Sequence, residues 1–375
     1  MSLGLLVLGL VLFVLLIVVH EFGHFIMARI NGVDVEEFGI FFPPRLWSKK
    51  TKTGWTFSLN AIPLGGFVRL KGEHDDDTGK RTYGASPLST KVKILIAGVT
   101  MNVIVAFIML TSLAWLGMPQ LVNNQFTVKS DTRTIKSEVL VGYVLPGSPA
   151  AKAGLRASDE LYEIIPPKGP AEHITTAIKL PPITKSVAGQ TIKLIFIRNK
   201  HQQSRTITLL SEKVVIASQK TKNPKANLGV APTQYNLQRS TWAAPVVALG
   251  VMKQFTVLTF KGVGSAISNL ARGNTAQASS QITGPVGIFA ILKEGSLLGY
   301  QFILMIVAVI SLSLAIMNIL PIPVLDGGKL FATLISRLFR KKLSAKVENG
   351  LYGAGLLVLL VLFTLITIVD VKRFF

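Results

Sequence analysis

The sequence predicts a mainly helical membrane protein, with four membrane-spanning helices, a membrane-associated β-hairpin and one inserted soluble α+β domain. Four apolar stretches, at residues 3–30, 92–116, 301–320 and 351–369, are each long enough to cross the hydrocarbon layer of a bilayer, which is about 30 Å thick. Hydrophobic residues make up 49% of the 375 residues, and the mean hydropathy is +0.49. Residues 126–215 are more polar and contain runs in which apolar and polar residues alternate, as in strands of a soluble domain.

The amino-acid composition limits which side chains could bind a metal and which kinds of partner the protein could have. The chain has no Cys, so disulfides and thiolate ligands are excluded, and a zinc site would have to use His and carboxylate groups. The formal net charge is +21, but the basic residues are spread over the loops rather than clustered with aromatic residues. We therefore expect loop topology and anionic lipid to account for the charge, and we expect no nucleic-acid partner.

The first apolar stretch carries the sequence His20-Glu21-Phe22-Gly23-His24. Residues four apart lie on one face of a helix, so His20 and His24 can direct two imidazoles at one metal ion. Glu21 lies beside them as a base for water. A pair of buried structural histidines is the alternative. The spacing, the Glu after the first His and the cost of ionisable groups in a membrane segment favour the metal site.

Residues 33–72 predict a β-hairpin. Residues 56–62 alternate between polar and apolar, residues 63–66 break the run, and alternation resumes after them. The segment is unusually aromatic, which would suit a hairpin that dips into the membrane beside the metal motif. Its edge, near Gly65 and Gly66, could pair with an extended peptide. An ordinary interfacial hairpin anchored by aromatic residues is the alternative.

The second apolar stretch contains one amide side chain, Asn102. A single Asn in a membrane helix commonly hydrogen-bonds to a neighbouring helix. Facing a metal site, it could also orient a substrate or a loop. Before this stretch, the acidic segment 73–78 is expected to be solvated surface.

The soluble region resembles a PDZ domain of the type found in bacterial envelope proteases. The similarity lies in residues 142–155, and residues 192–197 and 204–210 follow as later strands. Ser158 stands where the pattern usually has Gly, and the Pro-rich connection 166–185 is longer than usual. The PDZ fold is therefore expected, whereas its peptide-binding groove stays open.

Residues 216–299 are expected to form a polar linker and then a helix at 242–270. Scattered polar residues interrupt the apolar face of this helix. We expect it to lie in the membrane interface or to brace the soluble domain.

The third apolar stretch, 301–320, runs into Asn-Ile-Leu-Pro-Ile-Pro-Val-Leu-Asp-Gly-Gly at 318–328. The two prolines end the helix and the two glycines permit a tight turn. Asp326 then puts a carboxylate on irregular backbone at membrane depth. It could cap a helix at 327–338. The stronger hypothesis is a third metal ligand, because a catalytic zinc site needs three protein ligands and leaves its fourth position for water.

Charge predicts the orientation. Four spans place the loop 29–93 and the loop before 351–369 on the same side of the membrane, and both loops are rich in Lys and Arg. That side is expected to be cytoplasmic. The soluble domain and both termini then face outward, and the metal site lies in the cytoplasmic half.

Together these motifs resemble the bacterial site-2 protease family, the M50-type intramembrane zinc metalloproteases, in the branch that cleaves anti-sigma factors and membrane-bound remnant peptides. The resemblance covers nearly the whole chain. It implies that His20, His24 and Asp326 bind one catalytic zinc ion and that Glu21 is the catalytic base. It further implies that Asn318, Pro321 and Pro323 line the substrate path, and Asn102 matches the family's second-span Asn.

The expected function is hydrolysis of peptide bonds in or near the spanning segments of single-span membrane proteins or peptides, at a bacterial plasma (inner) membrane. Alternatives are a peptidase acting on soluble peptides, a non-proteolytic PDZ scaffold with a structural metal, and a metal transporter. A structural site needs no base, so Glu21 argues against the scaffold. A transporter should show several metal sites along a path, and the sequence offers one.

Overall fold

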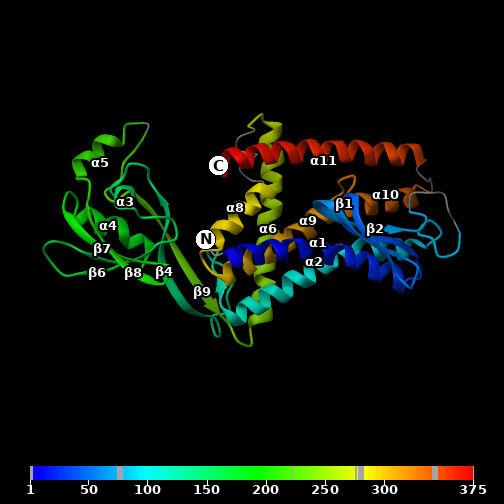
Figure 1. Cartoon of the computed structure of the whole chain (residues 1–375), viewed down its shortest axis with the longest axis horizontal. Helices are drawn as coiled ribbons and strands as arrows, with labels where there is room; N and C mark the ends of the chain where they lie inside the picture. Colours follow the sequence, from blue (N-terminus) through cyan, green and yellow to red (C-terminus); the bar gives the residue numbers. More distant parts are fainter. Residues whose placement is uncertain are drawn as a thin grey trace. The chain divides into compact units, whose positions relative to one another are not determined.

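The computed structural model describes residues 3–73, 79–221, 223–274, 277, 283–339 and 345–374 (Figure 1). The chain divides into two compact units. Unit 1 consists of Met1–Ala114 together with Ala244–Phe375, and unit 2 consists of Trp115–Ala243. Unit 2 is therefore an insertion between the two halves of unit 1.

Long apolar helices dominate unit 1. Within the described residues, five helices are long and apolar enough to cross a membrane: α1 (Leu3–Ile30), α2 (Leu88–Leu116), α6 (Ala244–Ala271), α9 (Tyr300–Ile319) and α11 (Ala345–Phe374, with its apolar part at Gly353–Arg373). The sequence predicted four spans and an interfacial or bracing helix where α6 lies. Two shorter helices, α8 (Pro285–Gly295) and α10 (Asp326–Leu338), flank α9 in the chain.

The helix α6 differs from the other four in direction and in composition. Figure 1 shows it running across the directions of α1, α9 and α11, and it contacts α9. Its most apolar window has a mean hydropathy of 1.4, against 2.4–3.0 for the other four helices.

Packing among the helices is uneven. Half of the apolar window of α2 is buried, so α2 lies at the centre of the unit. Only 6% of the window of α11 is buried, which makes α11 peripheral. One core cluster joins α1, α8 and α9 through the buried residues Leu6, Leu16, Leu292, Ile303 and Val307.

A small antiparallel sheet lies against the helices. Strand β1 (Val35–Lys50) pairs with β2 (Thr56–Leu70), and both strands bend. The first part of β1, residues 37–40, pairs on one side with 56–59 and on the other with 66–69. The segment 66–69 therefore forms an edge of the sheet, since no other described strand pairs with it. Phe25 of α1 anchors the sheet by contacts with the rings of Phe38 and Trp55.

Unit 2 contains a seven-stranded antiparallel sheet in the order β3-β9-β4-β5-β7-β8, with β6 paired to β5. Its strands are β3 (Met118–Pro119), β4 (Arg133–Val144), β5 (Glu160–Ile165), β6 (Glu172–His173), β7 (Thr191–Arg198), β8 (His201–Thr208) and β9 (Val230–Arg239). Its helices are α3 (Pro149–Lys152), the 3-10 turn η1 (Ala177–Lys179), α4 (Leu180–Ser186) and α5 (Glu212–Ser218). The core is apolar, with Phe196, Leu194 and Leu161 fully buried.

The boundaries expected for the soluble domain, 126–215, are too narrow. Strand β9 falls in the segment expected to be linker, yet it pairs with β4 along its whole length. Most of β9 is polar, which explains the linker prediction. Its inward-facing residues, Tyr235 and Leu237, are nevertheless buried. Strand β3, which pairs with β9, also precedes residue 126.

The unusual Ser158 has a structural consequence. Its φ angle is +68°, in the left-handed region where Gly carries no steric penalty. The turn directs the next residue, Asp159, inward, where its carboxylate accepts hydrogen bonds from Arg198 at 2.6 Å and from the Arg156 backbone N–H at 2.8 Å. The hydrogen bond to Asp159 raises the pKa of the Arg198 guanidinium.

Candidate metal centre

Two imidazoles of α1 face the same point. His20 and His24 are each 8% exposed, and their rings meet edge to face with centroids 4.9 Å apart. Their Nε2 atoms are 3.3 Å apart. The four-residue spacing on one helix produces this arrangement.

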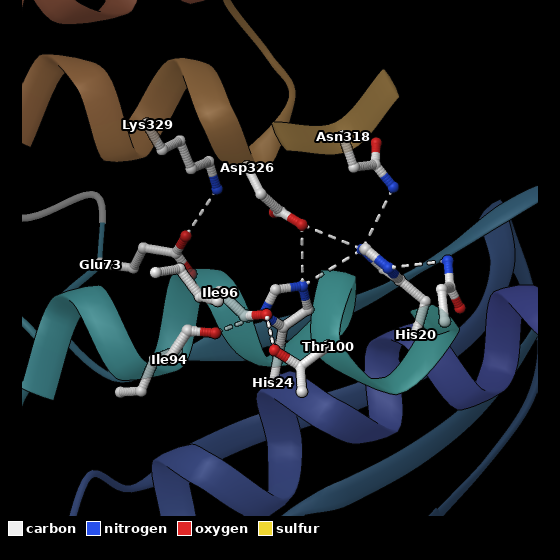
Figure 2. Close-up of polar contacts among 10 residues, drawn as sticks. His20, His24, Glu73, Ile94, Ile96, Thr100, Asn318, Asp326 and Lys329 are labelled. Atoms are coloured by element: carbon white, nitrogen blue, oxygen red, sulfur yellow. Dashed lines mark hydrogen bonds and ion pairs between the residues drawn. The ribbon is translucent and has the colours of Figure 1, made fainter. Parts of the chain in front are cut away.

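The third potential metal ligand, the carboxylate of Asp326, comes from the C-terminal half of unit 1. Asp326 opens α10, and its Oδ2 lies 3.0 Å from Nε2 of His20 and 3.1 Å from Nε2 of His24 (Figure 2). These three residues form the one cluster of potential metal ligands among the described residues, with ligand atoms within 4.8 Å of one another.

The loop before Asp326 sets its position. Helix α9 ends at Ile319, ahead of Pro321 and Pro323, and α10 starts at Asp326. Gly327 lies directly against the backbone carbonyls of Ile319 and Leu320, where any side chain would collide. This close approach folds α10 back onto the end of α9 and brings Asp326 to the two histidines.

The protonation of His24 makes the cluster suited to a cation. Its Nδ1 lies 2.8 Å from the carbonyl oxygen of Ile94 and can only donate to it, so Nδ1 carries the proton. When the ring is neutral, its Nε2 lone pair lies on the side of Asp326 Oδ2, 3.1 Å away, and is available to a cation. Two imidazoles with one carboxylate form a donor set of catalytic zinc sites.

The base candidate, Glu21, follows His20 on α1 and lies within electrostatic range of His20, His24 and Asp326. The edge strand of the small sheet passes beside it. A Cβ atom added to Gly66 would be 3.0 Å from Cγ of Glu21. Gly65, with φ of +147°, precedes this contact.

Helix α2 passes directly beside the two imidazoles. At Gly98 its backbone approaches the imidazoles so closely that an added Cβ would collide with Nε2 of His24 and lie 2.7 Å from Cε1 of His20. Sequence reasoning missed Gly98. The small residues Ala97 and Gly98, five and four positions before Asn102, were the available signal.

The remaining predicted residues lie at different distances from the cluster. Asn318 Nδ2 is 3.5 Å from Nε2 of His20, and Asn102 Nδ2 is 3.3 Å from Nδ1 of the same ring. Pro321 is exposed on the loop before Asp326. Pro323 lies farther along that loop and packs against Gly355 of α11.

One ion pair beside the site was not expected. Lys329, one turn after Asp326, pairs with Glu73 at 2.7 Å (Figure 2). The Glu73 side chain is 13% exposed and follows the end of β2. The expectation that 73–78 is solvated surface is therefore wrong for Glu73, and residues 74–78 lie outside the described part. The pair fastens α10 to the sheet that lies beside Glu21.

Known proteins match this chain over nearly its whole length. The model of "Peptidase family M50" matches residues 8–362. A protein of Clostridium perfringens that is named as a zinc metalloprotease is 29% identical over 369 residues, which cover 97% of each chain. One of Fusobacterium nucleatum is 28% identical over 362 residues, covering 96% of each. The protease Eep of Enterococcus faecalis is 24% identical over 453 residues, covering 97% of this chain and 98% of Eep.

Proposed function

Because the chain belongs to peptidase family M50 and is a membrane zinc metalloprotease, we propose that it hydrolyses peptide bonds in or near the spanning segments of other membrane proteins. The predicted family, enzyme class and metal are confirmed by these relatives. The observation that carries the proposal is the convergence of His20 and His24, on a helix long enough to cross a bilayer, with Asp326 at the start of α10, close to Glu21.

In this proposal the zinc ion would be held by His20, His24 and Asp326. The bound ion would polarise the scissile carbonyl and lower the pKa of water to about 7. Glu21 takes the proton of the attacking water and later delivers it to the nitrogen of the leaving amine. Its place on α1, one residue after the first ligand, supports this role.

A substrate helix hides its amide groups in i to i−4 hydrogen bonds, so it must unwind before it can be cut. An unwound segment in lipid needs new partners for its backbone. The edge of β2 at residues 66–69 could supply them, because the substrate would add a strand to the sheet. The contact between Gly66 and Glu21 would hold that strand beside the base. The side of the substrate path away from β2 would be lined by Asn318, Pro321 and Pro323.

The direction of α6 supports four spans rather than five. If α1, α2, α9 and α11 cross the bilayer, then α6, which runs across them, lies along a membrane surface (Figure 1). The Lys- and Arg-rich loops then support a cytoplasmic α1–α2 connection in a bacterial cell, with unit 2 outside the plasma (inner) membrane. There, a PDZ-like unit 2 would screen substrates before they reach the site.

The test compares wild type with Glu21→Gln in detergent, using a single-span reporter protein and a soluble version of the same cleavage sequence. We expect one zinc ion in both proteins and cleavage of the single-span reporter by wild type alone. Substantial turnover by Glu21→Gln would refute the base assignment. Equal cleavage of the soluble version by wild type would instead support a membrane-bound peptidase for soluble peptides.

A further inference from the structure

Asn102 is the most deeply buried polar side chain at the metal centre. It is 1% exposed on α2, and its Oδ1 is a buried atom without a hydrogen-bond partner in the described part of the chain. Its backbone is fixed as well, because the Ser311 hydroxyl of α9 donates to its carbonyl oxygen at 2.9 Å. Burying an amide oxygen without a hydrogen bond costs folding free energy. We therefore expect Oδ1 of Asn102 to have a hydrogen-bond donor as its partner.

The neighbour of this amide is the unused ring nitrogen of His20. Nε2 of His20 points at Asp326 Oδ2 and is the nitrogen available to a metal, whereas Nδ1 lies 3.3 Å from Asn102 Nδ2. A neutral imidazole that ligates through Nε2 carries its proton on Nδ1. With the amide nitrogen on that side, two N–H donors would face each other.

A half-turn of the amide group removes this conflict. The oxygen and nitrogen of an Asn side chain are nearly the same size, and their assignment rests on the hydrogen-bond network. In the turned orientation Oδ1 accepts from Nδ1–H of His20. The oxygen that lacked a partner gains one, and the Nε2 lone pair of His20 is left free for the metal.

The second histidine has a matching arrangement. Nδ1–H of His24 donates to the carbonyl oxygen of Ile94, also on α2, at 2.8 Å. Residues 94 and 102 are about two helical turns apart. Helix α2 thus offers one oxygen acceptor to each imidazole: a backbone oxygen for His24 and a side-chain oxygen for His20.

We propose that Asn102 is a positioning residue for the metal site, whose side-chain oxygen accepts from His20 Nδ1–H and thereby fixes the ring orientation and the tautomer that binds zinc. The inference rests on the proposed zinc site and gives Asn102 a role distinct from substrate contact.

The test measures zinc affinity of the full-length protein in detergent by competition with a chelator. Asn102→Leu removes the acceptor at similar volume and is expected to weaken zinc binding about 10–100-fold. Asn102→Asp keeps an oxygen acceptor and is expected to bind within about threefold of wild type. The matched control is Thr111→Val on the same helix, which removes a buried hydroxyl that also lacks a described partner and should leave the affinity unchanged.

Two results would overturn the inference: wild-type affinity in Asn102→Leu, or affinity in Asn102→Asp as weak as in Asn102→Leu. Gel filtration of each variant checks that it is folded. Failure of the proposed function looks different, because then wild type would bind no zinc, or His24→Ala and Asp326→Ala would bind it as wild type does. A zinc-binding wild type with an unaffected Asn102→Leu variant would refute only the role of Asn102.

Discussion

Gly98→Ala tests the geometry of the metal centre with the smallest possible change. The added methyl group would lie 2.7 Å from Cε1 and 2.8 Å from Nε2 of His20, and closer still to Nε2 of His24. The two His20 distances are 0.6–0.7 Å inside the 3.4 Å at which ordinary contact begins. Because the backbone of α2 cannot move freely within the centre of the unit, the imidazoles must shift.

The size of this shift predicts how much zinc affinity the variant loses. Zinc–ligand distances tolerate only about 0.2 Å of error, so a displacement of this size disrupts coordination. Overpacking typically costs about 1–3 kcal/mol. If that cost falls on the zinc-bound arrangement, zinc affinity drops roughly 5–150-fold, since about 1.4 kcal/mol corresponds to a factor of ten. Helix propensity acts in the opposite direction, because Ala favours a helix over Gly by about 1 kcal/mol.

The assay is zinc content of the purified protein after dialysis against buffers of fixed free zinc concentration, followed by cleavage of a single-span reporter. Gly4→Ala is the matched control. It makes the same change in α1 where the added Cβ would meet nothing within 4 Å, and it should behave as wild type. Wild-type zinc affinity in Gly98→Ala would refute the close approach of α2 to the two histidines.

Three further predictions concern neighbouring features. Asp326→Asn should lower zinc content by removing the charged ligand, as measured by elemental analysis; unchanged stoichiometry would leave Asp326 only a helix-capping role. Glu73→Lys and Lys329→Glu should each lower reporter cleavage, and the double exchange should restore part of it, because the ion pair of 2.7 Å fastens α10 beside the base; a double variant no better than the singles would argue against this link. Ser158→Gly should stabilise unit 2 by roughly 0.5–1 kcal/mol by relieving a left-handed backbone conformation, seen as about two- to fivefold slower amide hydrogen exchange in β5; faster exchange would contradict the strain argument.

The features that the sequence could predict depend on short spacings. His20 and His24 lie four residues apart on a helix, and Pro321, Pro323 and the glycines after Asp326 mark a helix end followed by a sharp turn. These local rules suffice to nominate the three potential ligands, which lie together in the structure. Their roles stay predictions until metal content is measured in variants.

The features that could not be predicted depend on how distant segments pack. Gly98 matters only because α2 passes within contact distance of two imidazoles on α1. Glu73 looks like part of a solvated acidic loop until α10 brings Lys329 to it. Strand β9 has the composition of a linker, and its partner β4 lies roughly a hundred residues earlier in the chain. None of these contacts leaves a periodic signal in the local sequence.

The distribution of the three potential ligands along the chain has a consequence for biosynthesis. His20 and His24 are made early, but Asp326 follows only after unit 2 and α9 have been synthesised. A nascent or prematurely terminated chain therefore carries the base and two imidazoles without the carboxylate. In the proposed mechanism such a chain cannot cleave its neighbours, so proteolytic activity in the membrane begins only when both halves of unit 1 have been inserted and joined.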